Sequence, residues 1–291
     1  MKILSNRFGV IALVMASGLG RLGAAQLQPA TSSAWEAYVA RADQQMRARV
    51  ASARPFLWVD EASGRKQRVQ NGAILVAPGL GSSGTETVPG GLIHHWLAAA
   101  FIPQANLSCV LWVAHDFAHY KQFYWPAVVD SKPLSTSGEH QDFSMRSLHH
   151  ALFITTAMES QFATIDFPMK AKRWYIVADS TRVQEIENFG QPNERLLPPA
   201  RGHGYTWRLH TITRYEERDG GVYVEMEAMA LSRDIPAAIR WFVAPAVARF
   251  SQSEIMTSLR QTREAVLAAS KAEQRVNVAE AAGLAAVAKA Q

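Results

Sequence analysis

Residues 205–231 read YTWRLHTITRYEERDGGVYVEMEAMAL, and this stretch decides the fold. Two strand-like runs flank Asp219-Gly220, a dipeptide typical of the two-residue type I′ turn, so the stretch predicts a β-hairpin. The turn fixes the register, which pairs Glu217 with Val222, Tyr215 with Val224, Thr213 with Met226, Thr211 with Ala228 and Leu209 with Ala230. One face of the hairpin is therefore apolar and built largely from small side chains.

The opposite face of the hairpin carries charge. It brings Arg214 beside Glu225, with Glu227 next on the same face of its strand. On an exposed face, these groups would form a cross-strand ion pair that contributes no more than about 1 kcal/mol. Inside a cavity they would act as polar anchors for a ligand head or for each other, because an unpaired buried charge is costly. We favour the exposed arrangement and keep both.

The chain after the hairpin is predicted to be helical. Ile235-Pro236 opens a helical segment, and Pro245 interrupts it. Ser251-x-x-Glu254 has the form of a capping box, and it precedes apolar residues at helical spacing. These residues are Ile255, Met256, Leu259, Val266 and Leu267. Residues 269–291 are rich in alanine and lack bulky apolar side chains, so we expect a flexible tail there.

The chain before the hairpin reads mostly as strand. Residues 92–102 are apolar on both parities, which suits a strand covered on both faces. Residues 106–124 indicate one or two short helices with Asn106 as the N-cap. Further strands are predicted at 127–134, 141–160, 162–169 and 173–188.

An N-terminal extension precedes this main body, over residues 26–87. Residues 34–51 place Trp35, Tyr38 and Met46 at helical spacing and predict an amphipathic helix. Residues 56–59 and 69–77 flank a turn and indicate a hairpin. A glycine-rich and serine-rich linker follows.

Residues 1–25 have the features of a secretory signal peptide: a positive start, a short apolar run and small residues before Gln26. Lys2, Arg7 and Arg21 lie inside it, so removal of these three cations lowers the formal net charge from +5 to +2. A nearly neutral mature chain argues against nucleic-acid binding. We expect a periplasmic or secreted protein with no transmembrane segment in the mature chain.

Three motifs carry a family resemblance: Gly90-Gly-Leu-Ile-His-His-Trp96, Asp116-Phe-Ala-His-Tyr120, and Gly220-Gly-Val-Tyr-Val-Glu-Met-Glu227 followed by Leu231-Ser-Arg-Asp-Ile-Pro236. With the order of the elements, they make residues 88–268 similar to the START-like, or SRPBCC, superfamily, and in particular to its exported bacterial members. The resemblance implies an α+β helix-grip fold, in which a curved antiparallel sheet of about seven strands wraps on a long C-terminal helix. Lipid carriers and polyketide cyclases both occur in this superfamily, so the resemblance does not decide the activity.

The resemblance also implies a cavity between the sheet and the C-terminal helix. We expect the apolar hairpin face and the facing helix to line it. The predicted ligand-binding residues are Trp207, Leu209, Thr211, Met226, Ala228, Ala230, Phe242, Ile255 and Leu259. The alternative is that these side chains fill an ordinary solid core.

Metal and catalytic motifs are weak in this sequence. His115 and His119 stand four apart without a clear third ligand, and His94-His95 and His149-His150 each point to opposite faces of a strand. We therefore expect no metal and no cofactor. The only cysteine, Cys109, lies in an apolar run and is expected to be a buried packing residue.

These observations favour a binding or carrier module for an apolar, lipid-like small molecule. The first alternative is an enzyme of the cyclase or aromatase type, in which Arg214, Glu225 or a cavity histidine polarises a carbonyl. The second is a structural or assembly factor with a solid core. The catalytic residues and any protein partner stay open at this point.

Overall fold

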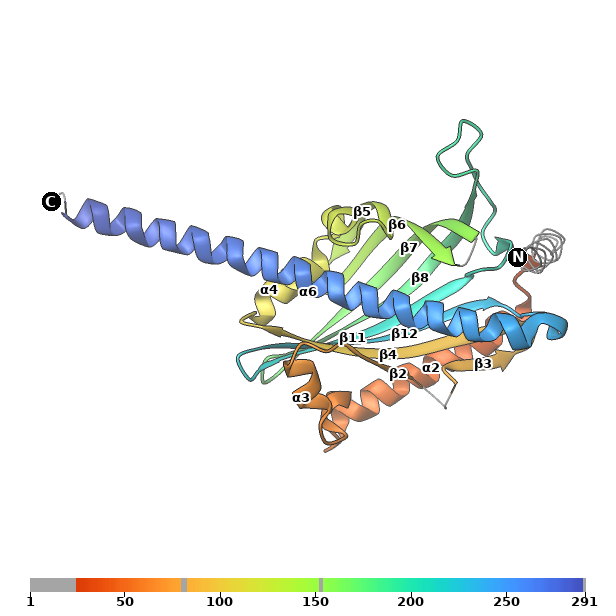
Figure 1. Ribbon diagram of the computed structural model, residues 1–291, viewed down its shortest axis with the longest axis horizontal. Helices are drawn as coiled ribbons and strands as arrows, with labels where there is room; N and C mark the ends of the chain where they lie inside the picture. Colours follow the sequence, from red (N-terminus) through yellow and green to blue (C-terminus); the bar gives the residue numbers. More distant parts are fainter. Residues whose placement is uncertain (1–24, 80–82, 152–153, 290–291) are drawn as a thin grey trace, which may run out of the picture.

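A computed structural model describes residues 25–79, 83–151 and 154–289. A large antiparallel sheet is covered on one face by the long helix α6 (Ala237–Lys289) and on the other by α2 (Pro29–Ala51) (Figure 1). We name these two faces the α6 face and the α2 face. The signal peptide predicted over residues 1–25 lies almost entirely outside the described residues. No helix among the described residues is long and apolar enough to cross a membrane.

The main sheet contains 10 strands among the described residues. Its order is β2 (Leu75–Pro78), β4 (Gly91–Pro103), β12 (Gly221–Arg233), β11 (Arg208–Arg218), β8 (Arg173–Glu187), β7 (Ile154–Met169), β6 (His140–Ala151) and β5 (Val128–Ser137), with β3 (Thr85–Val88) on β4 and β9 (Arg195–Leu196) on β8. The short strands β2, β3 and β9 account for the difference from the expected seven. A separate two-stranded sheet joins β1 (Ala25–Gln26) to β10 (Arg201–Gly202).

The β11–β12 hairpin confirms the predicted register. Leu209 pairs with Ala230, Thr211 with Ala228 and Arg214 with Glu225. At the turn, Asp219 has a φ of 56° and Gly220 a φ of 77°, the left-handed pair that a type I′ turn requires. β4 and β8 flank the hairpin on either side, so its residues lie in the middle of the sheet.

The short helices α4 (Leu107–His115), η2 (Phe117–His119) and α5 (Tyr120–Phe123) confirm the helical prediction for residues 106–124. Asn106 caps α4, because its side-chain oxygen accepts a hydrogen bond from the Cys109 N–H at 2.7 Å. Cys109 itself is buried, as predicted, with its sulfur 3.2 Å from the Ser270 hydroxyl.

Helix α6 corrects the predicted break at Pro245 and the predicted capping box at Ser251. It runs without a break through Pro245. The proline removes one backbone hydrogen bond, and the remaining bonds of a long helix can tolerate this loss. Ser251 therefore lies inside the helix and donates to the Val247 carbonyl at 3.1 Å, so it caps nothing. The helix also continues past residue 268 to Lys289, beyond the edge of the sheet (Figure 1).

The N-terminal extension has its predicted helix, α2, but the predicted hairpin after it is wrong. The chain instead forms η1 (Trp58–Asp60), α3 (Arg65–Gln70) and the single strand β2. Gly64 adopts a φ of 82° immediately before α3, and residues 65–68 are good helix formers without β-branching. Val69 is the buried residue by which α3 is attached to the core.

Together, these elements form an α+β helix-grip fold of the START-like kind. The strand order, the antiparallel pairing and a C-terminal helix packed on one face of the sheet define it. The N-terminal extension adds a second layer on the opposite face.

Candidate functional site

The α6 face changes in exposure along its strands. Near the hairpin turn, Val222, Val224 and Tyr215 are buried in one cluster with Leu259 and Val266 of α6. Further from the turn the same face is partly exposed, at Leu209, Thr211, Met226, Ala228 and Ala230. A side chain beneath a covering helix keeps contact with solvent only where the two layers do not close on each other. We call these five the chamber residues, and the partly exposed part of the α6 face that they form the chamber.

The position of α6 explains this opening. α6 packs most heavily against β4 and less against β12, β2, α4 and α5. A side-chain hydrogen bond also links it to β6, near the other edge of the sheet. The side chains of Thr211 and Ala228 are small, and both remain partly exposed.

The other predicted ligand-binding residues divide into three groups. Ile255 and Leu259 are buried in the packed cluster. The side chain of Phe242 lies outside the described part of the chain. Trp207 is on the other face, in the core cluster beneath α2. It precedes the first residue of β11, so strand alternation does not govern its direction.

A polar wall joins the sheet to α6. His149 of β6 places Nδ1 2.8 Å from a carboxylate oxygen of Glu254 on α6, and Nε2 3.1 Å from the hydroxyl of Ser147. Its ring also meets Phe250 edge-on, with the ring centres 6.2 Å apart. Met145, Ser147 and His149 lie at every second position of β6 and therefore share one face. Met145 packs against the same aromatic cluster as the chamber residue Leu209. The sequence offered no signal for this link, because Glu254 is distant in sequence.

A second polar group lies towards the packed end of the α6 face. The buried carboxylate of Asp166 accepts hydrogen bonds from Trp174 at 2.8 Å, from His115 at 2.9 Å and from Gln141 at 3.2 Å. These three donors satisfy the carboxylate, so the group has a structural explanation. His119 instead pairs with Asp116 at 2.6 Å, which separates the two histidines that a metal site would need to share. No group of three potential metal ligands occurs among the described residues.

The charged hairpin residues correct the sequence prediction, because they are neither exposed nor in the chamber. Arg214 is 2% exposed and Glu225 0% exposed, beneath α2. Glu225 accepts hydrogen bonds from the backbone N–H groups of Trp58 and Val59, both at 2.8 Å, and lies 3.2 Å from the Arg214 guanidinium. Burial raises the pKa of Glu225, and the guanidinium and the two N–H groups oppose this effect. Strand alternation could not reveal that an N-terminal segment covers this face.

The same buried network continues to α2 through a histidine. Glu227 is 3.3 Å from Arg214 and 2.9 Å from His95, whose other ring nitrogen is 2.9 Å from the Tyr38 hydroxyl on α2. Burial would raise the pKa of Glu227, but the His95 hydrogen bond and the Arg214 charge outweigh it and hold the pKa below its usual value. Burial raises the pKa of Tyr38 to about 12.

His210 forms a second link to α2. Its ring is fully buried, with Nδ1 2.6 Å from Asp179 on β8 and Nε2 3.2 Å from Asp43 on α2. Burial alone would lower the pKa of His210, but the hydrogen bond to Asp179 and the close carboxylate of Asp43 raise it to about 9. His210 therefore carries a charge at neutral pH, held between two carboxylates.

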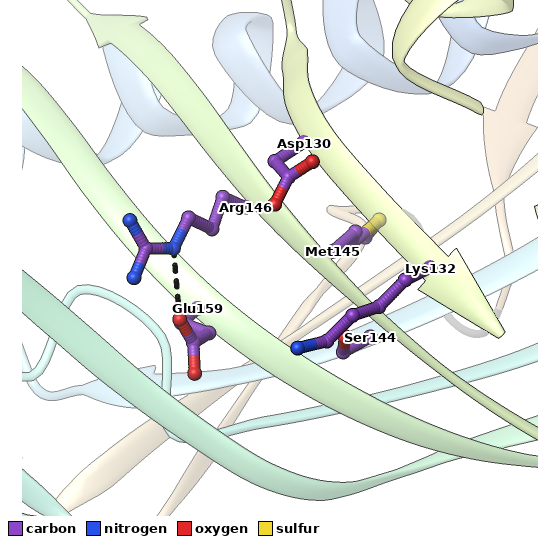
Figure 2. Close-up of a pocket in the computed structure, with 6 residues that line it drawn as sticks. All are labelled: Asp130, Lys132, Ser144, Met145, Arg146 and Glu159. Carbon is purple, nitrogen blue, oxygen red and sulfur yellow. Dashed lines mark hydrogen bonds and ion pairs between the residues drawn. The ribbon is translucent and has the colours of Figure 1, made fainter. Parts of the chain in front are cut away.

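Two surface hollows lie outside the chamber. One, of about 100 Å³, is lined by residues that include Asp130, Lys132, Arg146 and Glu159 on the side of β5–β7 that faces away from α6 (Figure 2). Arg146 in this hollow is already paired with Glu159 at 2.8 Å. The other, of about 260 Å³, lies between α6 and the start of β2, and its lining includes Val76 and Met256.

No family model matches the chain, and no curated protein matches it by sequence. Among solved structures, its fold is similar to that of a STAR-related lipid transfer protein fragment from Xanthomonas axonopodis, at 15% identity over 63% of this chain and 98% of that one, with a TM-score of 0.42. Human STARD10 is similar at 9% identity over 67% and 78%, with a TM-score of 0.43. The Zhui aromatase/cyclase from Streptomyces sp. R1128 is similar at 14% identity over 63% and 96%, with a TM-score of 0.40. At such identities the likeness concerns the fold alone.

Proposed function

We propose that the protein binds one apolar, lipid-like small molecule in the chamber between the β11–β12 hairpin and α6. The observation that carries this proposal is the partial exposure of small and apolar side chains on a sheet face that a helix covers. Ligand binding to such a face is favourable, because the ligand displaces water and removes apolar surface from solvent.

The expected affinity is modest. Burial of about ten methylenes contributes roughly 8 kcal/mol at about 0.8 kcal/mol each. Ordering the ligand and restricting its translation and rotation offset much of this free energy. Short acyl chains should therefore bind with micromolar or weaker dissociation constants, and affinity should rise with chain length until the chamber is full.

Titration of a fluorescent fatty acid into the wild type and two variants tests the proposal. Ala228→Trp fills the chamber, and Ala98→Trp makes the same change on the same face at a fully buried position. We expect Ala228→Trp to weaken uptake about tenfold or more, which corresponds to about 1.4 kcal/mol, while the protein stays folded. Ala98→Trp should destabilise the fold by about 1–3 kcal/mol through overpacking.

Two other outcomes would count against the chamber. If the wild type shows no saturable uptake and Ala228→Trp is sharply destabilised, the α6 face is a solid core. If uptake is unchanged in Ala228→Trp but falls in Val76→Trp, the ligand occupies the hollow between α6 and β2.

We also propose that this binding takes place outside the cytoplasm, after cleavage following Ala25. Support comes from the charged and apolar pattern of residues 1–25. The attachment of the new N-terminus would survive, because the Leu27 N–H donates to the Ala200 carbonyl at 2.9 Å. Intact-mass analysis of the exported protein tests this: a mass that still includes residues 1–25 would contradict cleavage.

A further inference from the structure

Three side chains of the polar wall form a directed hydrogen-bond relay. The Ser147 hydroxyl lies 3.1 Å from His149 Nε2, and His149 Nδ1 lies 2.8 Å from a carboxylate oxygen of Glu254. The order is hydroxyl, imidazole, carboxylate, with one partner on each ring nitrogen. Both distances are within hydrogen-bond reach, the geometry that an activated serine nucleophile requires.

The Glu254 carboxylate determines which tautomer the His149 imidazole adopts. When Nδ1–H donates to Glu254, Nε2 carries the lone pair and accepts the proton of the Ser147 hydroxyl. The ring is partly exposed, with 25% of the His149 side chain accessible, whereas Ser147 is only 4% exposed. The relay therefore runs from the partly exposed Glu254 of α6, through a partly exposed imidazole, to a nearly buried hydroxyl on the same face of β6 as Met145.

A second hydroxyl lies beside this relay without a partner. Ser160 on β7 is 1% exposed, and its oxygen has no hydrogen-bond partner among the described residues. Met145 pairs with Ser160 and Ser147 pairs with Met158, so Ser160 is the diagonal neighbour of Ser147 on the same face. A buried hydroxyl without a partner is costly, and a ligand oxygen that accepts its hydrogen bond would remove that cost.

We propose that the chamber is also an esterase site, in which Ser147 is the nucleophile, His149 the general base and Glu254 the positioning residue. The substrate class is an ester of an apolar acyl chain. The proposal rests on the proposed function, because the chamber must hold that chain. The Ser160 hydroxyl donates to the carbonyl oxygen as negative charge develops on it.

The reaction needs only water as co-reactant. Ser147 Oγ attacks the ester carbonyl carbon and its proton passes to His149 Nε2; the bond to the alcohol oxygen then breaks, and the alcohol leaves with that proton. Water attacks the acyl-serine next and gives a proton to His149. The Ser147 oxygen departs, takes this proton back, and the free acid is released. Glu254 stays ionised throughout.

Covalent labelling of the full-length folded protein with an alkyl fluorophosphonate, followed by peptide mass spectrometry, tests the nucleophile. We expect the label on Ser147, its loss in Ser147→Ala, and hydrolysis of p-nitrophenyl octanoate to fall about a hundredfold or more in His149→Gln. Glu254→Gln should lower kcat and leave the affinity for the fluorescent fatty acid unchanged. His150→Gln is the matched control: it is the next residue on β6, bonds Thr155 at 2.9 Å, and should leave labelling and turnover intact.

The outcomes separate this proposal from the binding proposal. Saturable fatty-acid uptake without labelling of Ser147 would reject the esterase and leave the relay as a link between β6 and α6. Labelling that persists in His149→Gln at the wild-type rate would reject the relay as the activating device. Absence of uptake and of labelling would reject both proposals together.

Discussion

The two faces of the central hairpin are each covered by a helix, yet they are packed in opposite ways. On the α2 face, Arg214 and Glu225 are buried with large aromatic rings; Arg214 pairs with Glu225 and Glu227, and Glu225 accepts hydrogen bonds from the covering segment. On the α6 face, the small residues Thr211 and Ala228 remain partly exposed beneath a helix. Charge can thus be buried where each charged group has a fixed partner of opposite charge. Small apolar side chains, by contrast, keep some contact with solvent beneath α6.

The difference has a physical basis in what each face demands. A buried guanidinium must keep its carboxylates, because the free energy of an unpaired charge in the interior is prohibitive. The ion pairs of the α2 face therefore hold its side chains and the covering segment in one arrangement. The chamber has no such constraint, and its apolar side chains exchange contact with water for contact with a ligand.

The largest effect is expected from breaking the α2 face. Glu225→Gln leaves the Arg214 charge without its nearest partner and places an amide N–H group against the backbone donors of Trp58 and Val59. We expect the free energy of unfolding to fall by about 3–5 kcal/mol. Thr211→Val, on the α6 face of the same hairpin, is the control and should change it by less than about 1 kcal/mol. Urea denaturation measures both, and equal effects would contradict the contrast between the faces.

A second comparison divides the α6 face itself. Leu259 is 1% exposed in the packed part, so Leu259→Ala should cost about 2–5 kcal/mol. Met226 borders the chamber, and Met226→Ala should cost clearly less, because part of its side chain already meets solvent. If the two substitutions cost the same, the packed and open parts of this face do not differ.

The next effect is a pH dependence on the α2 face. The folded pKa of His210, about 9, lies above the ordinary histidine value of 6.5. Its contribution to stability is therefore fully present below pH 6.5 and is lost as the pH rises towards 9, by up to about 3 kcal/mol at 1.36 kcal/mol per pH unit. Thermal melts between these pH values should show a steeper loss for the wild type than for His210→Gln. Parallel curves would exclude His210 as the cause.

The local pattern of the hairpin predicted its own structure well. Asp219-Gly220 determined the turn and hence every cross-strand pair, because a two-residue type I′ loop permits one register. It could not predict what covers each face. The charge of Arg214 suggested solvent, whereas α2, more than 160 residues earlier, supplies the cover. Strand alternation predicted the wrong face for Trp207, because this residue lies one position before β11 begins.

The candidate site was predictable only in part, for the same reason. The chamber residues of β11 and β12 followed from the hairpin register. The relay did not, because it joins Ser147 and His149 on one strand to Glu254 on a distant helix. The neighbouring pair His149-His150 suggested only a metal ligand, which alternation along the strand then excluded.

The most direct test of the chamber uses two methionines on one strand. Met226 and Met229 of β12 lie on opposite faces, the first partly exposed towards α6 and the second 1% exposed beneath α2. With ¹³C-methyl methionine labelling, NMR titration with lauric acid should shift the Met226 methyl signal saturably, at about one ligand per protein, and leave the Met229 signal in place. Equal shifts at both methyl groups, or a saturable shift at Met229 alone, would contradict the assignment of ligand binding to the α6 face.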